Sequence, residues 1–300
     1  VAKKVRVVSR AFGSDEAWAW ESDGVEGYTI EPAEREGHGT DIILTLKDNA
    51  ANSDGTGESF DTFLSEYGLK SLIKRYSNYV RYPVQMEVSK TREKPKPEDA
   101  GDDYQPEYES YTELDTINSM IPIWKRGKSE VTDEEYKTDF HDFADPARTF
   151  SIHAEGALSY DALLFIPGRA PYDLYSKDFK KGLALYSSNV LIMEKCEELL
   201  PDHYNFVRGV VDSQDLTLNI SRETLQHNSQ LRAIAKKVEK KITSELKKMR
   251  DNDREEYERF FENFGRGLEY GIYTSYGMLK DELADLLLFY SAKQQKLITL

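Results

Sequence analysis

The sequence contains a single cysteine, Cys196, among 300 residues. This scarcity excludes an intramolecular disulfide and a zinc site built from several thiolates. Long apolar runs are also missing, because no stretch approaches the roughly 18 apolar residues that a membrane-spanning helix needs. Residues 1–5 begin in a strand-like alternation rather than in the charged and then apolar regions of a signal peptide. A reducing cytoplasm is therefore the expected location.

Positive charge is scarce relative to negative charge, with 40 Lys and Arg against 54 Asp and Glu and a net charge of −14. Because phosphate neutralisation needs clustered Lys and Arg, this balance disfavours a general nucleic-acid binder. The hydrophobic fraction of 39% and the length fit a soluble globular chain of about two domains. The chain starts at Val1 rather than at Met, so we expect it to be an excerpt of a longer protein.

The first part of the chain has the pattern of a sheet followed by helix. Alternating apolar and polar residues over 3–47 predict a half-buried sheet. Apolar spacing of three and four over 60–80 predicts two helical runs separated by Gly68. Residues 84–88 return to a strand pattern.

The composition changes over residues 91–115, which contain nine acidic residues, three basic residues and three prolines. Leu114 is the one aliphatic residue there apart from Ala100. Such a composition buries too little apolar surface to order itself, so a solvated linker is predicted. This linker would divide the chain into units at 1–90 and 116–300.

The second unit combines strands with a helical end. Strands are predicted at 150–153, 162–167 and 189–193, and helices at 231–249, 256–264 and 279–290. The first of these helices carries one apolar stripe with gaps of three and four residues. We therefore predict an α+β or layered α/β fold with a helical extension.

A candidate phosphate site lies at the predicted start of a helix near residue 221. Ser221 is a favourable N-cap, and Glu223 in the first turn complements the helix dipole. Arg222 and Gln226 would project from one face beside the helix N-terminus, which suits a terminal phosphate. An arginine delivered from one domain to a phosphate bound in another is an arginine finger. From spacing alone, a solvent-facing Arg222 paired with Glu223 or Asp215 is the favoured interpretation.

Other candidate sites carry weaker signals. The stretch Gly-His-Gly-Thr at 37–40 lacks the context of a phosphate-binding loop, so a plain glycine turn is favoured. The five histidines show no metal-ligand spacing, and the acids around Cys196 would raise its thiol pKa. Neither a metal site nor a thiol nucleophile is expected.

Two apolar segments in loop-like contexts leave two interpretations open. One is 121–126, which contains Trp124, and the other is 167–175, which contains Tyr172 and Tyr175. Exposed clusters of this kind mark partner surfaces, whereas buried ones are core or satellite packing.

Four ordered blocks of sequence give the chain a family resemblance. They resemble the middle domain of the bacterial heat-shock protein 90 (Hsp90) chaperones. The blocks are WKR at 124–126 with EVTDEEY at 130–136, LFIPGRAP at 164–171, FVRGVVDS at 206–213, and LNISRETLQ at 218–226. Residues 1–5 and 39–46 also resemble strands of the N-terminal nucleotide domain of that family, so the resemblance covers essentially the whole chain.

The resemblance implies a fold and an activity. Residues 1–90 would be the C-terminal part of a split-ATPase α/β sandwich shared with gyrase-type ATPases and histidine kinases, and 91–115 the charged linker. Residues 116–300 would be a middle domain, with an αβα part at 116–227 and a truncated helical part at 228–300. The family implies a homodimeric chaperone that uses ATP with Mg²⁺ to remodel non-native client proteins.

The resemblance also assigns roles to individual residues, and it reverses the preference for a solvent-facing Arg222. The assigned residues are Arg222 for the γ-phosphate of ATP, Asn219 and Gln226 for the catalytic loop, Thr40 for the neighbourhood of the adenine, and Trp124, Tyr172 and Tyr175 for client surfaces.

The sequence departs from the family pattern in ways that limit these roles. The family's catalytic glutamate, the Asn and Asp that hold nucleotide, and the glycine-rich lid would precede Val1, and the dimerisation domain would follow Leu300. We therefore expect this chain alone neither to bind ATP tightly nor to hydrolyse it. Residues 187–189 are Ser-Ser-Asn where many relatives carry basic residues, which weakens a charge-based client contact there.

Two rival functions remain beside the ATP-driven chaperone. One is a non-catalytic scaffold that binds clients or partners. The other is the ATPase part of a type II topoisomerase, which the net charge of −14 and the middle-domain blocks disfavour.

Overall fold

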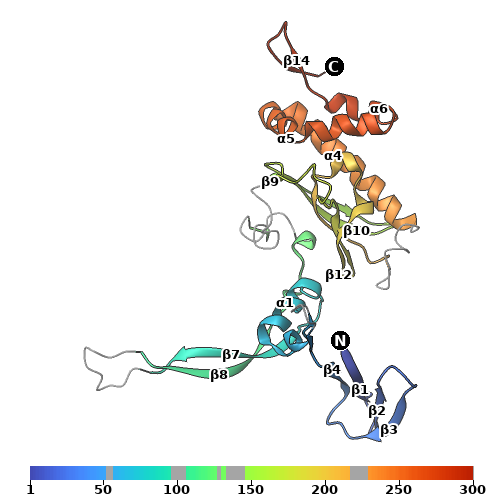
Figure 1. Ribbon diagram of the computed structural model, residues 1–300, viewed down its shortest axis with the longest axis vertical. Helices are drawn as coiled ribbons and strands as arrows, with labels where there is room; N and C mark the ends of the chain where they lie inside the picture. The colour runs from blue at the N-terminus through green and yellow to red at the C-terminus, as the bar shows by residue number, and fades with distance from the viewer. Residues whose placement is uncertain (52–56, 96–105, 127–129, 133–145, 217–228, 300) are drawn as a thin grey trace. The chain divides into compact units, whose positions relative to one another are not determined.

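The computed structural model consists of two compact units, Val1–Leu72 and Ile73–Leu300 (Figure 1). The residues that it describes are 1–51, 57–95, 106–126, 130–132, 146–216 and 229–299. The fold is mixed α/β, as predicted. The assignment of the two units to a split-ATPase domain and an αβα middle domain stays a prediction.

The first unit is built on a four-stranded antiparallel sheet with the order β3-β2-β1-β4. This confirms the strand pattern predicted over 3–47. The two helical runs predicted over 60–80 correspond to the short helix η1 and the helix α1, but the break between them is at Ser65 and not at Gly68, which lies inside α1. The helix α1 crosses the boundary between the units. The elements are β1 (Ala2–Arg10), β2 (Ala17–Ser22), β3 (Thr29–Ala33), β4 (Gly39–Leu46), β5 (Ala50–Ala51), β6 (Gly57–Glu58), η1 (Asp61–Leu64) and α1 (Glu66–Tyr76).

Burial in this sheet is uneven. Val8 of β1 and Ala17 and Ala19 of β2 are buried, so the central strands have one covered face. The edge strand β4 instead exposes Ile42 and Leu44. The prediction of a half-buried sheet therefore holds for β1 and β2 and is wrong for β4 within this chain.

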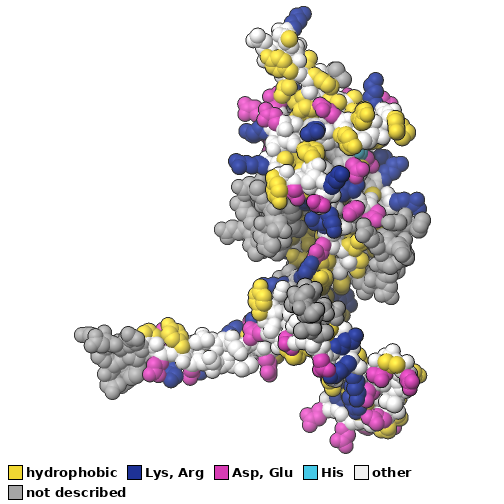
Figure 2. Space-filling model, viewed as in Figure 1, with side chains coloured by type: hydrophobic (Ala, Val, Ile, Leu, Met, Phe, Trp, Pro, Cys, Tyr) yellow, Lys and Arg dark blue, Asp and Glu magenta, His cyan; other side chains and the backbone are white. Residues whose placement is uncertain are grey.

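The second unit begins with an antiparallel ribbon of β7 (Gln85–Glu93) and β8 (Tyr108–Thr116), in which Gln85 faces Thr116 and Glu93 faces Tyr108. Charged side chains of both signs lie along it (Figure 2). The interpretation of 91–115 as a solvated linker is thus wrong for residues 91–93 and 108–115. Residues 96–105 lie outside the described residues.

Opposite charges at facing positions explain why so acidic a segment forms strands. Arg92 Nε lies 2.6 Å from Glu109 Oε1, and Lys94 Nζ lies 2.9 Å from Glu107 Oε2. The guanidinium of Arg92 also lies over the ring of Tyr111. Cross-strand pairs of this kind each contribute about 0.2–1 kcal/mol, and the ladder hydrogen bonds satisfy the backbone. Pairing between strands replaces the apolar core that the segment lacks.

A five-stranded sheet with the order β12-β11-β13-β10-β9 forms the centre of the second unit. All neighbours are antiparallel except β11 and β13, which are parallel. The strand β10 is buried along nearly its whole length, as its continuous apolar run predicts. The strands are β9 (Pro146–Ala154), β10 (Tyr160–Pro167), β11 (Leu183–Ser187), β12 (Val190–Cys196) and β13 (Arg208–Asp212).

The C-terminal part of the unit is helical, with α4 alongside the sheet and α5 and α6 beyond it (Figure 1). The stripe predicted for 231–249 is confirmed, because its six apolar side chains on α4 are all buried. None of the described helices has the length and apolar character to cross a membrane. The remaining elements are η2 (Ile123–Lys125), η4 (Glu197–Leu199), η5 (Asp202–Tyr204), α4 (Ser229–Asn252), α5 (Arg254–Thr274), α6 (Lys280–Leu283), η6 (Ala284–Leu286), β14 (Phe289–Ser291) and β15 (Lys296–Ile298).

The helix predicted at 279–290 is wrong in its second half. The helical turns end where Leu287 adopts an extended conformation. Leu287 and Leu288 are buried, and the chain then pairs as β14 with β15. Tertiary packing of these leucines therefore overrides their helix propensity.

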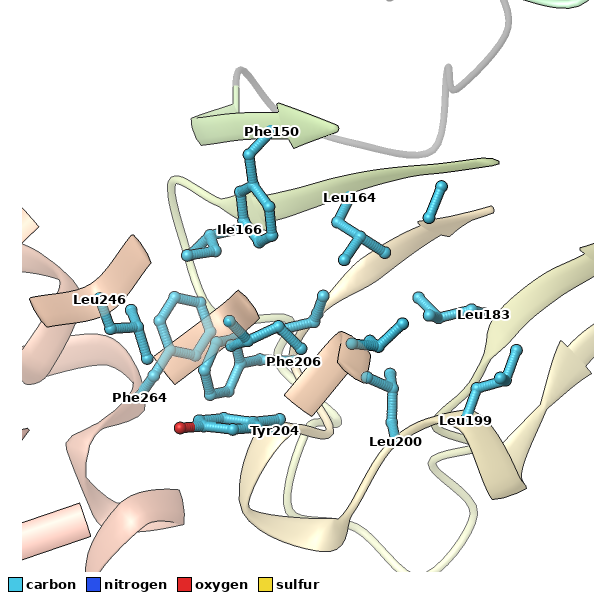
Figure 3. Close-up of a cluster of buried hydrophobic side chains, with 14 of the residues drawn as sticks. Phe150, Leu164, Ile166, Leu183, Leu199, Leu200, Tyr204, Phe206, Leu246 and Phe264 are labelled. Carbon is cyan, nitrogen blue, oxygen red and sulfur yellow. The ribbon is translucent and has the colours of Figure 1, made fainter. Parts of the chain in front are cut away.

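An aromatic cluster joins the sheet to the helices (Figure 3). The ring of Phe206, just before β13, stacks on Phe264 of α5 at 4.6 Å between centroids and meets Phe260 edge-on at 5.4 Å. The hydroxyl of Tyr204 lies 2.7 Å from Thr243 Oγ1 on α4. Burial of each large ring contributes about 1.5–3 kcal/mol, so sheet and helices share one core.

Two glycines of α5 provide a matched test of this packing. An added Cβ at Gly271 would lie 2.6 Å from the Cβ of His203, which is buried, whereas at Gly267 it would lie 3.5 Å from the His203 carbonyl oxygen. We expect Gly271→Ala to lower the free energy of unfolding by about 1–3 kcal/mol. We expect Gly267→Ala to be neutral or to raise it by up to about 1 kcal/mol, since alanine is the better helix former. Urea denaturation would measure both, and equal effects would contradict the described contact.

Candidate functional site

Three predicted site residues, Asn219, Arg222 and Gln226, lie outside the described residues, as does the predicted N-cap Ser221. The chain that leads to them is described up to Leu216. Its contacts show how the base of the predicted catalytic loop is held.

The carboxylate of Asp212, the last residue of β13, is the centre of these contacts. It has no exposed side-chain surface, and Lys125 Nζ lies 2.7 Å from its Oδ2. Trp124 Nε1 donates to the same oxygen at 3.3 Å, and the backbone N–H of Asn189 donates to Oδ1 at 3.2 Å. A buried charge needs such partners, because an unpaired carboxylate in the interior is strongly unfavourable.

The β11–β12 turn is shaped to deliver one of these donors. Ser188 and Asn189 both have positive φ, at 50° and 67°, as the two central residues of a type I′ hairpin turn require. The side-chain oxygen of Asn189 also accepts from Lys125 Nζ at 2.6 Å. From the sequence, residues 187–189 were notable only for their lack of basic side chains, and this role of the turn was missed. The sequence feature that could have predicted this turn is the Ser-Asn pair at 188–189, which lies between two strand-like patterns.

Further contacts anchor the chain after Asp212. Ser213 Oγ donates to the carbonyl of Ser159 at 2.8 Å, and the backbone N–H of Ser159 donates to Asp215 Oδ2 at 2.7 Å. Ser187 Oγ donates to the carbonyl of Leu216 at 2.5 Å. The chain is therefore fixed up to Leu216, six positions before Arg222.

The ring of Trp124 belongs to the interior and not to an exposed patch. It is 7% exposed and packs against Tyr79 at 4.7 Å and Tyr186 at 4.8 Å between centroids. Of the two interpretations left open, core packing is confirmed for this ring. A client role for Trp124 stays a prediction and would have to act through its neighbours.

Thr40 lies in the first unit at the start of β4, and its side chain is exposed. Its hydroxyl oxygen lies 2.9 Å from Ser9 Oγ on β1. The preceding turn has positive φ at Gly37 and Gly39, which agrees with the predicted glycine turn. The hydroxyl is available to a ligand, and its predicted place near the adenine stays a prediction.

The loop between β10 and β11 presents the other two predicted client residues. Tyr172 is fully exposed and Tyr175 is 51% exposed, while Leu174 between them is buried. The backbone N–H of Ala170 donates to Asn263 Oδ1 on α5 at 3.1 Å. The loop is therefore tied to α5 at one point and offers aromatic surface at another, so the partner-surface interpretation fits Tyr172 and Tyr175.

Within the described ranges, no group of three or more His, Cys, Asp or Glu side chains is arranged to hold a metal ion. The exposed His153 lies 2.5 Å from Asp161 and 3.2 Å from Glu155. These carboxylates, Asp161 first, raise the pKa of the imidazole by hydrogen bonding.

Cys196 is fully buried. Burial, and then the neighbouring Glu198, raise the pKa of its thiol to about 12. Burial rather than the adjacent acids is thus the main reason why it is a poor nucleophile.

The chain is similar to known proteins over its whole length. The family profile described as "Hsp90 protein" matches residues 98–300. The chain is 52% identical to the "Chaperone protein HtpG" of Clostridium perfringens (strain 13 / Type A) and 50% identical to the "Chaperone protein HtpG" of Clostridium botulinum (strain 657 / Type Ba4). Each match covers 100% of this chain and 47% of the relative, so the chain spans about half the length of the curated relatives it matches.

The buried Asp212 carboxylate should be important for stability. In Asp212→Asn the ion pair with Lys125, whose side chain is one-quarter exposed, is lost. We expect the free energy of unfolding to fall by about 2 kcal/mol, toward the low end for a buried pair. Asp178→Asn is the control, because Asp178 is exposed, and should change it by less than about 0.5 kcal/mol. Equal effects of the two substitutions in urea denaturation would contradict the role of Asp212.

The Cys196 thiol should be unreactive in the folded chain. With a pKa of about 12, roughly one molecule in ten thousand carries a thiolate at pH 8, and burial removes access as well. Reaction with Ellman's reagent should therefore be at least about a hundredfold slower in the native chain than in guanidinium. Similar rates in both conditions would show that the thiol is accessible.

Proposed function

Because the chain belongs to the Hsp90 family, we propose that the whole protein is an ATP-dependent molecular chaperone that binds and remodels non-native client proteins. The proposal draws on the relatives named "Chaperone protein HtpG", to which this chain is 50–52% identical. This activity is proposed for the whole protein, because this chain spans only about half the length of its relatives.

The role proposed for Arg222 is to complete an ATP site formed mainly by another part of the protein. A guanidinium near the γ-phosphate would stabilise the negative charge that develops on phosphoryl transfer. Asn219 and Gln226 would hold the loop that carries it. A glutamate outside this chain would orient the attacking water, and Thr40 would lie near the adenine. Mg²⁺ would accompany the nucleotide and neutralise phosphate charge when bound.

The observation that best supports this role is the anchored end of β13. Asp212 is held by Trp124 and Lys125, and the carbonyl of Leu216 is held by Ser187. A catalytic side chain must be placed within about half an ångström of its productive position, which requires a rigid base for its loop. These contacts supply such a base six positions before Arg222.

We also propose where clients bind and how the protein is assembled. Tyr172 and Tyr175 on the β10–β11 loop would contact apolar segments of clients, since exposed aromatics of this kind favour partner binding. The whole protein would be a homodimer through a domain outside this chain, and it would work in the cytoplasm without nucleic-acid or membrane partners.

A non-catalytic client-binding scaffold is the second candidate. The fully exposed ring of Tyr172 favours it, because that surface needs no nucleotide to bind an apolar segment. In that case Arg222 would have only a structural role.

ATP hydrolysis by the whole protein with Arg222→Ala tests the first candidate. We expect steady-state hydrolysis to fall by about tenfold or more, equivalent to about 1.4 kcal/mol in the barrier, while ATP affinity changes little. Arg259→Ala is the matched control, since Arg259 is exposed on α5, away from the predicted catalytic loop in the sequence, and it should leave hydrolysis unchanged.

Two outcomes would contradict the finger role of Arg222. One is an unchanged rate of hydrolysis, and the other is a loss of ATP binding as severe as the loss of turnover. If the rate is unchanged and Tyr172→Ala weakens protection of a denatured client, the scaffold candidate is favoured.

A further inference from the structure

The side chain of Arg35 closes the glycine turn at 37–40 that leads into β4. Its guanidinium pairs with both carboxylate oxygens of Asp41, with Nε 2.9 Å from Oδ2 and Nη2 2.9 Å from Oδ1. Nη1 also donates to the backbone carbonyls of Glu36 and Gly37, each at 3.2 Å. Two parallel hydrogen bonds between a guanidinium and a carboxylate fix the orientation of both groups. One side chain therefore holds the two ends of the turn together.

Arg35 is itself fixed against the sheet. Only 18% of its side chain is exposed, and Arg10 Nη1 on β1 donates to its backbone carbonyl at 3.2 Å. Gly39 leaves room for the guanidinium, because an added Cβ would lie 3.0 Å from Arg35 Nη2. Gly39 also has a φ of 131°, which glycine adopts without strain. The guanidinium thus packs against the backbone immediately before Thr40.

Thr40 lies on a face of the sheet that fits the edge of a purine base. It pairs with Ser9 of β1, which pairs in turn with Trp18 of β2, and cross-strand partners share one face. Ile42, two positions further along β4, lies on the same face. Trp18 and Ile42 are 47% and 66% exposed, so two neighbouring hydroxyls lie beside exposed apolar side chains. Adenine has apolar faces and a polar edge, and this surface offers a partner to each.

The contacts of Arg35 lie away from the hydroxyl of Thr40. Asp41 follows Thr40 directly in β4, so its side chain points to the opposite face of the strand. The hydrogen bonds of the guanidinium described above all go to residues 36, 37 and 41. Arg35 would therefore influence a ligand beside Thr40 through the position of the backbone and not by contact.

From these contacts we propose that Arg35 is a positioning residue of the ATP site. By closing the glycine turn it fixes where β4 begins, and so it holds the hydroxyl of Thr40 where the edge of the adenine reaches it. Without this closure, two glycines would leave the start of β4 free to change conformation. The inference rests on the proposed function, because it deepens the role given there to Thr40.

Isothermal titration calorimetry of ATP binding to the whole protein tests the proposal with a double-mutant cycle. The variants are Arg35→Gln, Thr40→Val, which removes the hydroxyl but keeps the branched shape, and the two combined. We expect each single substitution to weaken ATP binding about fivefold. We expect the double variant to bind within about twofold of the weaker single variant, since both substitutions remove one contact. A role of Arg35 independent of Thr40 would instead give losses that multiply to about 25-fold.

The matched control is another arginine of the same sheet. Arg6 on β1 forms ion pairs with Glu21 and Glu31 at 3.3 and 3.1 Å. It precedes Ser9 by three positions, so its side chain lies on the opposite face from the two hydroxyls. We expect Arg6→Gln to leave ATP affinity unchanged.

A second substitution reaches the same contact from its other side. Asp41→Asn removes the charge that Arg35 pairs with but keeps the shape of the side chain. We expect it to weaken ATP binding as much as Arg35→Gln does, and to keep the test valid if Arg35→Gln does not fold. Circular dichroism of the nucleotide-free proteins would establish which variants are folded.

Three results would overturn this inference alone, each with Thr40→Val weakened. They are unchanged ATP affinity in folded Arg35→Gln or Asp41→Asn, losses that multiply in the double variant, and equal losses in Arg35→Gln and Arg6→Gln. Unchanged affinity in Thr40→Val would overturn both this inference and the proposed place of Thr40 near the adenine. Because the readout is binding and not turnover, failure here and failure of the proposed role of Arg222 are distinguishable.

Discussion

The ion pair between Asp212 and Lys125 is the interaction on which the arrangement around the end of β13 depends. A carboxylate removed from water is tolerated only with close partners, so its burial requires η2, the β11–β12 turn and the last residue of β13 to meet at one point. Trp124 lies in the same group and brings an aromatic cluster to it. A single buried charge thus makes elements distant in sequence interdependent, and the chain beyond Leu216 begins from that fixed point.

The parts of the fold that were predictable are those in which each residue's environment repeats along the chain. The apolar stripe of α4 and the continuous apolar run of β10 are examples, since helix and strand periodicity place their side chains without reference to other segments. Prediction failed where a distant partner decides the structure. Residues 91–93 form a strand only because 108–110 lie opposite, and Leu287 leaves the helix only because the core accepts it.

The candidate site divides in the same way. Arg222 was identified by the resemblance of a local block and by its place beside a predicted N-cap, both of which are properties of contiguous sequence. Asp212 and Ser187 were missed, because their importance comes from partners 88 and 29 positions away. Trp124 was ambiguous for a related reason, since a tryptophan in a short irregular segment has no periodicity from which to infer burial.

The pairing of β7 with β8 has a consequence for how this segment tolerates change in length. Gln85 and Thr116 are partners at the base of the ribbon, so their separation is set by strand spacing and not by the number of residues between them. Residues added or removed at the far end would lengthen or shorten the ribbon without moving either residue at its base. The distance between Gln85 and Thr116 therefore does not depend on how many residues the ribbon contains. This segment can gain or lose residues during evolution while the elements on either side keep their positions.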